Sequence, residues 1–177
     1  MQRFDASRFE DPDTVAAGAG ARLVGYAGLA RRHAGDPEAF QRQVYAVASE
    51  AMRGVPSPEP RDPPPFEAIR ELFFQGDDIH PEASILAVRD GRVVGLTVTT
   101  MPTERVASTT FTGVARSDRG RGLALAMKLR AIAALRAAGA THFGTSNDAG
   151  NAPMRGINAR LGYVPDPPVT QVEKRLA

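Results

Sequence analysis

The stretch Val114-Ala-Arg-Ser-Asp-Arg-Gly-Arg-Gly-Leu-Ala124 decides the fold of this 177-residue chain. It follows Ala107 to Val114, a run that predicts a strand, and it enters a helical pattern of leucines and alanines that ends at Gly139. Backbone N–H groups at the start of a helix have no helical partner, and the helix dipole adds positive potential there. Glycine lets an anion approach the backbone closely, and arginine adds fork-shaped donors. The stretch therefore predicts a phosphate-binding loop.

Two common phosphate-binding motifs do not fit this loop. A P-loop requires Gly-Lys-Ser/Thr after four intervening residues, and no such run occurs in the sequence. The dinucleotide fingerprint requires a third glycine where Leu125 stands, and an acidic residue about 20 positions on, where residues 141–143 lie. A tight turn whose glycines serve geometry alone is the alternative interpretation.

The rest of the chain predicts one mixed α/β domain. Residues 1–21 lack large apolar side chains and are interpreted as a polar tail or linker, which leaves 22–177 as the domain. Asp36-Pro37 is a typical helix start, Asp90-Gly91 is the pair that a type I′ hairpin turn requires, and the six prolines within 55–65 predict an extended loop. Helices are expected over 36–54, 66–73, 122–139 and 154–161, and strands over 23–26, 84–88, 93–101, 107–114, 141–146 and 169–176.

Composition excludes several kinds of site. The chain has no cysteine, which excludes thiol nucleophiles and disulfides, and its three histidines lie too far apart to predict a metal site. No apolar run approaches the roughly 20 residues of a membrane span, and the N-terminus lacks the pattern of a signal peptide. We therefore expect a cytoplasmic protein without a membrane partner.

The overall charge is nearly balanced, with 22 basic and 20 acidic residues, so no nucleic-acid partner is expected. One local cluster departs from this balance. It is either a solvated helix start or a docking surface for a polyanion, and its members are Arg116, Arg119, Arg121, Lys128 and Arg130.

The segment Arg119-Gly-Arg-Gly-Leu-Ala124 resembles the Gln/Arg-x-x-Gly-x-Gly/Ala signature of the GCN5-related N-acetyltransferase (GNAT) family. The downstream segment Thr145-Ser-Asn-Asp-Ala-Gly-Asn-Ala-Pro-Met154, continued to Tyr163, is similar to the second motif of that family. The resemblance covers roughly residues 22–176 and is nearest to single halves of tandem-domain, mycothiol-synthase-like members. It implies a mixed, mostly antiparallel sheet that splays between its fourth and fifth strands, with helices on both faces.

By this resemblance, acetyl-coenzyme A is the co-substrate. The backbone of Gly120 to Leu125 would hold the pyrophosphate, the strand end Thr112 to Val114 would pair with the pantetheine arm, and Asn151 would contact or position that arm. The residues expected at the coenzyme are Thr112, Gly113, Val114, Arg119, Gly120, Arg121, Gly122, Leu123, Ala124, Leu125 and Asn151.

The implied reaction transfers acetyl to the amine of a small molecule. It requires a neutral amine, a polarised carbonyl and a proton for the departing thiolate. Asn158 stands where the family commonly has a proton-donating Tyr, and an Asn amide does not deliver a proton. The catalytic candidates are Asn147, Asn158 and, as the base, Glu104, with Asp148 as an alternative base.

Several alternatives remain open at the level of sequence. Water, Ser146, Tyr163 or direct release of thiolate would replace the missing acid. A non-catalytic acyl-coenzyme A binder with a regulatory or assembly role is the second functional interpretation. The acceptor would be selected by the loops 55–65 and 75–83, and the protein is expected to be a monomer or a homodimer.

Overall fold

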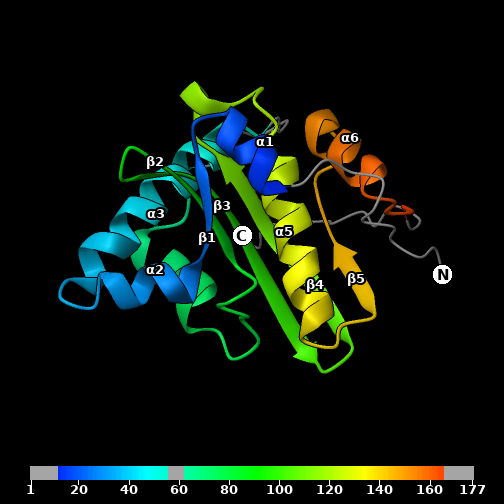
Figure 1. Cartoon of the computed structure of the whole chain (residues 1–177), viewed down its shortest axis with the longest axis horizontal. Coiled ribbons are helices and arrows are strands. Elements are labelled where there is room, and N and C mark those ends of the chain that lie inside the picture. The colour runs from blue at the N-terminus through cyan, green and yellow to red at the C-terminus, as the bar shows by residue number, and fades with distance from the viewer. Residues whose placement is uncertain (1–11, 56–61, 166–177) are drawn as a thin grey trace, which may run out of the picture.

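The computed structural model describes residues 12–55 and 62–165. The described residues contain one five-stranded sheet with helices on both faces (Figure 1), which confirms the predicted fold class. The helices are α1 (Pro12–Gly18), α2 (Tyr26–Arg32), α3 (Pro37–Arg53), α4 (Phe66–Arg70), α5 (Leu123–Ala137) and α6 (Ala152–Arg160). The strands are β1 (Arg22–Gly25), β2 (Ile85–Arg89), β3 (Arg92–Thr103), β4 (Val106–Val114) and β5 (His142–Thr145).

The strands follow the order β1-β2-β3-β4-β5 across the sheet. Every neighbouring pair is antiparallel except β4 and β5, which run parallel. The predicted hairpin is confirmed: Asp90 and Gly91 between β2 and β3 have φ angles of 49° and 75°, the left-handed conformation that a type I′ turn needs at both positions.

Side chains of β3 alternate between the two faces of the sheet, as strand geometry requires. Leu96 and Val98 share a hydrophobic cluster with residues of α3 and α4. On the opposite face, Gly95 makes room for α5, because a Cβ on Gly95 would lie 2.9 Å from Cε of Met127. Helices α3 and α4 therefore cover one face, and α5 covers the other together with α1 (Figure 1).

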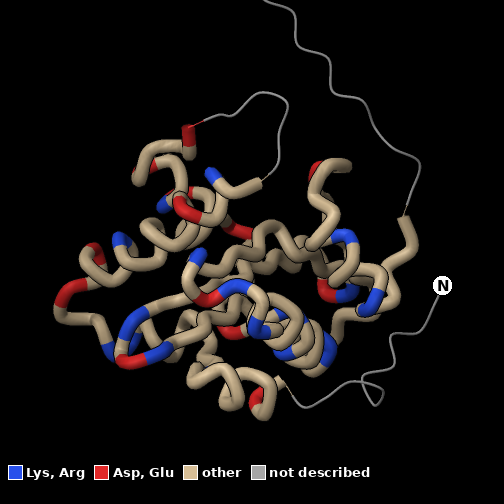
Figure 2. Tube along the Cα trace, turned by 90° about the horizontal axis from the view of Figure 1, so that it is seen from above, with Lys and Arg blue, Asp and Glu red and all other residues tan. Residues whose placement is uncertain are grey.

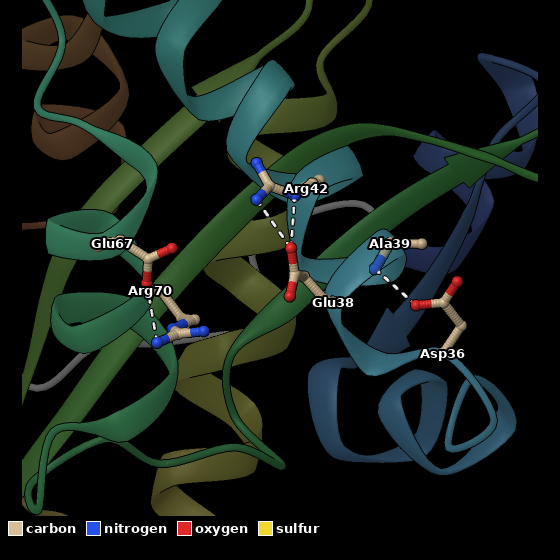
Figure 3. A network of polar contacts seen from close by, with 6 residues as sticks. All are labelled: Asp36, Glu38, Ala39, Arg42, Glu67 and Arg70. Atoms are coloured by element: carbon tan, nitrogen blue, oxygen red, sulfur yellow. Dashed lines mark hydrogen bonds and ion pairs between the residues drawn. The ribbon is translucent and has the colours of Figure 1, made fainter.

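Helix α3 begins and ends where the sequence predicts. The Asp36 side chain accepts a hydrogen bond of 3.0 Å from the Ala39 N–H, with proline in the first turn, and Gly54 is the C-cap. Exposed ion pairs of 2.7 Å between Glu38 and Arg42, and of 2.8 Å between Glu67 and Arg70 on α4, lie on the same side of the molecule (Figure 3). Such exposed pairs contribute little to stability, so the cap and the buried face of α3 determine its position.

Strands β4 and β5 form a fork. They pair only from Val106↔His142 to Thr109↔Thr145, whereas β4 stays paired with β3 as far as Val114. The β3–β4 register shifts beside Thr110, a bulge that increases the local twist. Within residues 12–55 and 62–165, the edge of β4 from Thr110 to Val114 therefore has no strand partner on the β5 side, which confirms the predicted splay.

Two short helices differ from the sequence predictions. Residues 12–18, expected as part of a polar tail, form α1, whose Ala16 is fully buried in a cluster with Ala126 and Ala131 of α5. Small side chains allow this close helix approach but give no strong apolar signal in the sequence. Helix α2 was also not predicted, since its only buried residue is Leu29.

The remaining predictions fall partly outside the described residues. The tail over 1–11, the prolines within 56–61 and the last strand over 169–176 all belong to segments that the structure does not describe. Within the described part of the chain, no helix combines the length and the apolar character needed to cross a bilayer.

Candidate functional site

A cavity of about 420 Å³ lies where β4 leaves the fork and α5 begins. It is bordered on one side by the end of α3 and on the other by α6, so segments far apart in sequence meet around it. All of the residues predicted to bind the coenzyme line this cavity except Arg121: Thr112, Gly113, Val114, Arg119, Gly120, Gly122, Leu123, Ala124, Leu125 and Asn151. A second hollow, of about 750 Å³, lies beside β5 and contains none of these residues.

The loop before α5 presents unpaired backbone donors. Within the described residues, no hydrogen bond is made by the N–H groups of Gly120, Arg121 or Gly122. Gly122 is the N-cap of α5 and supplies no side-chain cap, so the first-turn N–H groups are also free of intrahelical partners. Together with the dipole of a 15-residue helix, these donors form an anion cradle.

The two glycines of the loop have different surroundings. Both have positive φ, 76° at Gly120 and 79° at Gly122, which a side chain would strain. A Cβ on Gly120 would meet nothing within 4 Å, so the backbone there borders open space. A Cβ on Gly122 would instead lie 3.0 Å from Cγ1 of Val15, so Gly122 also makes room for α1. A substitution at Gly122 therefore perturbs helix packing as well as the loop.

Arg119 is held against the end of α3. Its Nε donates a hydrogen bond of 3.1 Å to the carbonyl of Val114. Its guanidinium lies on Gly54, where a Cβ would be 2.7 Å from both terminal nitrogens. The C-terminus of a helix carries partial negative charge, which favours a cation at this position.

Two carboxylates fix the loop, and the sequence did not reveal either role. Glu50 of α3 accepts a hydrogen bond of 2.9 Å from the Arg116 N–H. Asp118, only 1% exposed, pairs with Arg89 of β2 at 2.7 Å and accepts a hydrogen bond from Ser117. In the sequence, Asp118 stands among arginines, which suggests an exposed, solvated turn. Its partner Arg89 lies 29 positions away, so the sequence does not reveal the pair.

The arginine cluster of the sequence does not form one surface. Arg119 faces the end of α3, Lys128 is buried, and Arg130 pairs with Asp13 of α1 at 2.7 Å. Acidic residues lie among the basic ones along the chain trace (Figure 2). The structure therefore does not support the interpretation of these basic residues as one docking surface for a polyanion.

The asparagines of the second motif lie on α6 and in the loop before it. Asn151 is the N-cap, and its side chain accepts a hydrogen bond of 3.2 Å from the Met154 N–H. Asn158 donates from Nδ2 to Oδ1 of Asn147 at 2.6 Å. Asn158 is 7% exposed, and its own Oδ1 is buried without a hydrogen-bond partner. An unpaired buried acceptor is costly, and a ligand donor would relieve that cost.

Glu104 does not join these residues. It lies in the exposed turn between β3 and β4, beyond the Val106↔His142 end of the β4–β5 pairing, where its carbonyl faces Gly139. The cavity begins on β4 at Thr112, roughly 25 Å further along an extended strand. Glu104 therefore does not line this cavity, and its role as a base stays a prediction.

Lys128 and Tyr163 lie near Thr109, where the β4–β5 pairing ends; this point is the closed end of the fork. Lys128 of α5 is 1% exposed, and burial lowers its pKa to about 8. Its Nζ lies 5.4 Å from the centre of the Tyr163 ring. Burial raises the pKa of Tyr163, while a hydrogen bond with the Thr109 side chain acts in the opposite direction. In the sequence, Lys128 belongs to a cluster of basic residues, but its helical position among Leu125, Leu129 and Ile132 is a signal for burial.

The fold and the cavity define a protein with a forked sheet and an anion cradle at the open end of the fork. Residues 43–163 match the model of the acetyltransferase (GNAT) family. This match covers more than half of the chain, so the protein belongs to the GNAT family, as its motifs predicted. The nearer relation to tandem-domain members stays a prediction.

Solved structures with the same fold are distant in sequence, and no curated protein matches the chain. The aminoglycoside N-acetyltransferase AAC(6')-Iy in complex with coenzyme A is 16% identical, with a TM-score of 0.59 over 88% of this chain and 94% of that one. The ribosomal-protein-S18-alanine N-acetyltransferase of Escherichia coli is 16% identical, with a TM-score of 0.57 over 71% and 72%. A GCN5-related N-acetyltransferase from Sphaerobacter thermophilus is 22% identical, with a TM-score of 0.57 over 81% of this chain and 41% of that one. Membership of this family agrees with acetyl-coenzyme A as the co-substrate.

Proposed function

We propose that this protein transfers the acetyl group of acetyl-coenzyme A to the amine of a small molecule. The observation that carries the proposal is the continuity between the anion cradle of Gly120 to Leu125 and the unpaired edge of β4. A ligand that is anionic at one end and extended at the other fits this combination, and coenzyme A has that form.

The residues that line the cavity suit each part of coenzyme A. The free N–H groups of the loop and the N-terminus of α5 suit a pyrophosphate, and Arg119 suits a further phosphate oxygen. The open edge of β4 offers backbone groups to the amides of the pantetheine arm. Met154 and Ile157 line the opposite wall and suit its apolar carbons.

The direction of the arm follows from the fork. An arm that lies along β4 from Val114 toward Thr112 leads its sulfur toward the closed end of the fork, near Thr109. The bulge beside Thr110 turns backbone groups in this part of β4 away from the regular ladder, where they can polarise a carbonyl. The acceptor amine would reach the acetyl carbon from the other side of the sheet.

The proposal of a small-molecule acceptor is supported by likeness of fold to aminoglycoside acetyltransferases. Likeness to the enzyme named for ribosomal-protein alanine argues for a peptide amine instead. Since these likenesses are of fold alone, the acceptor is decided by experiment.

Binding and turnover are tested separately. We expect acetyl-coenzyme A at 100 times its Kd to add about 2.7 kcal/mol to the free energy of unfolding, with a matching rise in Tm. Thiol release is then measured with a panel of aminoglycosides, polyamines and simple aryl- and alkylamines, and with peptides that begin with alanine.

Turnover of a small amine supports the proposal. Turnover of peptides alone contradicts the acceptor class, and binding without any thiol release supports a non-catalytic coenzyme A binder. An unchanged Tm refutes the proposal altogether.

A further inference from the structure

Lys128 occupies an unusual position for a lysine. It lies one turn beyond Ala124, a cavity-lining residue, on the same face of α5. That face covers β3 and β4, where Thr97 and Thr99 are fully buried and Thr97 pairs with Thr112 across the strands. Helix α5 runs back along β4, so Lys128 lies between the cavity and the closed end of the fork.

No anion in the described part of the chain compensates this buried cation. Among residues 12–55 and 62–165, Lys128 has no ion pair or hydrogen bond, and its one polar contact is the face of the Tyr163 ring. The attraction of a cation to an aromatic face is too weak to offset the loss of hydration of a buried ammonium group. A buried charge retained at such a cost indicates a role in binding or reaction.

The charged groups on the neighbouring elements are directed elsewhere. Asp13 of α1 pairs with Arg130, and Arg89 of β2 pairs with Asp118. Tyr163 is the titratable group that contacts Lys128. The remaining charged or titratable residues of α5, β3, β5, α6 and the loop before α5 are exposed: Arg92, Arg116, Arg119, Arg121, Arg136, His142, Arg155 and Arg160.

We propose that the ammonium of Lys128 stabilises the thiolate that leaves acetyl-coenzyme A and then gives it a proton. This inference rests on the proposed function. In the reaction, the neutral acceptor nitrogen bonds to the acetyl carbon, and the C–S bond breaks with its electron pair passing to sulfur. A proton moves from Nζ of Lys128 to the sulfur and forms the thiol. The acylated nitrogen loses its extra proton to water, and water returns a proton to Lys128.

The other groups near the fork serve this role less well. The side chain of Asn158 carries no ionisable proton, and its Nδ2 is committed to Asn147. Tyr163 is proton-bearing, but burial raises its pKa and makes it a weaker acid. Lys128 has a pKa of about 8, close to that of a thiol, and an acid of matched pKa transfers a proton most effectively near neutral pH. Its ammonium makes no hydrogen bond to any described residue that would prevent it from turning toward the cavity.

The experiment compares the wild type with Lys128→Met, which keeps an unbranched, mostly apolar side chain of nearly the same length and removes the ammonium group. We expect kcat to fall about 100-fold, while the Kd of acetyl-coenzyme A stays within about threefold of the wild type. The wild type should lose activity as the pH rises through about 8, and this limb of the profile should be absent in Lys128→Met. In Lys128→Arg, which stays protonated, the limb should move to higher pH.

Arg130→Met is the matched control, because it removes an exposed cation from the same helix. It should leave kcat and the pH profile unchanged. Equal kcat values and equal pH profiles for the wild type and Lys128→Met would overturn the role of Lys128 and leave the proposed function intact. A wild type that binds acetyl-coenzyme A but releases no thiol, or that does not bind it, overturns both. A purely structural role predicts a loss of kcat without any change in the shape of the pH profile.

Discussion

The guanidinium of Arg119 lies directly on the Cα of Gly54, close enough that a Cβ on Gly54 would be 2.7 Å from both of its terminal nitrogens. This contact joins the last turn of α3 to the loop that precedes α5. It places a forked cation at the rim of the cavity and leaves its outer donors available to a ligand. Arg119 is therefore positioned by a glycine that lies 65 residues earlier in the chain.

Replacing Gly54 with valine should weaken coenzyme A binding without unfolding the protein. The end of a flexible arginine side chain can move, so the free energy of unfolding should change by less than about 1 kcal/mol. Moving Arg119 removes charged hydrogen bonds worth about 1.5–3 kcal/mol, or a 10- to 100-fold rise in Kd by titration calorimetry. Gly35→Val is the control, since a Cβ there meets nothing within 4 Å. An unchanged Kd in Gly54→Val would show that Arg119 does not contact the ligand.

Replacing Asp118 with asparagine should destabilise the fold strongly. The substitution leaves Arg89 beside a buried neutral group, and removing one partner of a buried pair costs about 3–5 kcal/mol. Glu82→Gln is the control, because it breaks an exposed pair with Arg31 and should cost less than about 1 kcal/mol. Urea unfolding measures both. Equal costs for the two substitutions would contradict the assignment of Asp118 as the buried anchor of the loop.

Replacing Gly120 and Gly122 with alanine, one at a time, should distinguish the cost of backbone strain from the cost of disturbed packing between α1 and the loop. Both substitutions force a side chain into a left-handed conformation, at about 1–2 kcal/mol each. Gly122→Ala should cost more than Gly120→Ala, because its Cβ also presses on Val15 of α1. Thermal unfolding compares the pair, and Val15→Ala combined with Gly122→Ala should recover the difference. A larger cost at Gly120 would contradict the packing of α1 described above.

Burial of Lys128 should make the free energy of unfolding depend on pH between about 8 and 10.5. Its pKa is about 8 in the folded state and 10.5 in the unfolded chain, so between these values the unfolded state binds more protons. The free energy of unfolding should therefore rise with pH across this window, by on the order of 3 kcal/mol in total. The raised pKa values of Tyr26 and Tyr163 act oppositely above about pH 10, so the clearest interval is pH 8–10.

Lys128→Met isolates this contribution. At pH 7 the variant should be more stable than the wild type, because the buried charge is gone, and the difference should shrink as the pH rises toward 10. Urea unfolding at several pH values measures it, with Arg130→Met as the exposed control. A constant difference between the wild type and Lys128→Met across this interval would show that the lysine does not titrate with a lowered pKa.

The local elements of the fold could be predicted from sequence because their signals are local. Asp36 and Gly54 bound α3, Asp90-Gly91 forms the hairpin, and the Leu125-to-Ile132 spacing identifies α5. Helix α1 was not predicted, because alanines that pack tightly against another helix look the same in sequence as alanines in a linker.

By itself, the sequence determined the glycine-rich turn before α5, the order of the main strands and helices, and the family, since these depend on residues that are neighbours in the chain. The tertiary structure alone decided what surrounds the loop. It paired Asp118 with Arg89, placed Gly54 under Arg119, put Glu104 in an exposed turn outside the cavity lining and buried Lys128 beside the fork. The physical reason is that burial and charge pairing arise from contacts between distant segments, and these contacts set the pKa values and the donor geometry on which the chemistry depends.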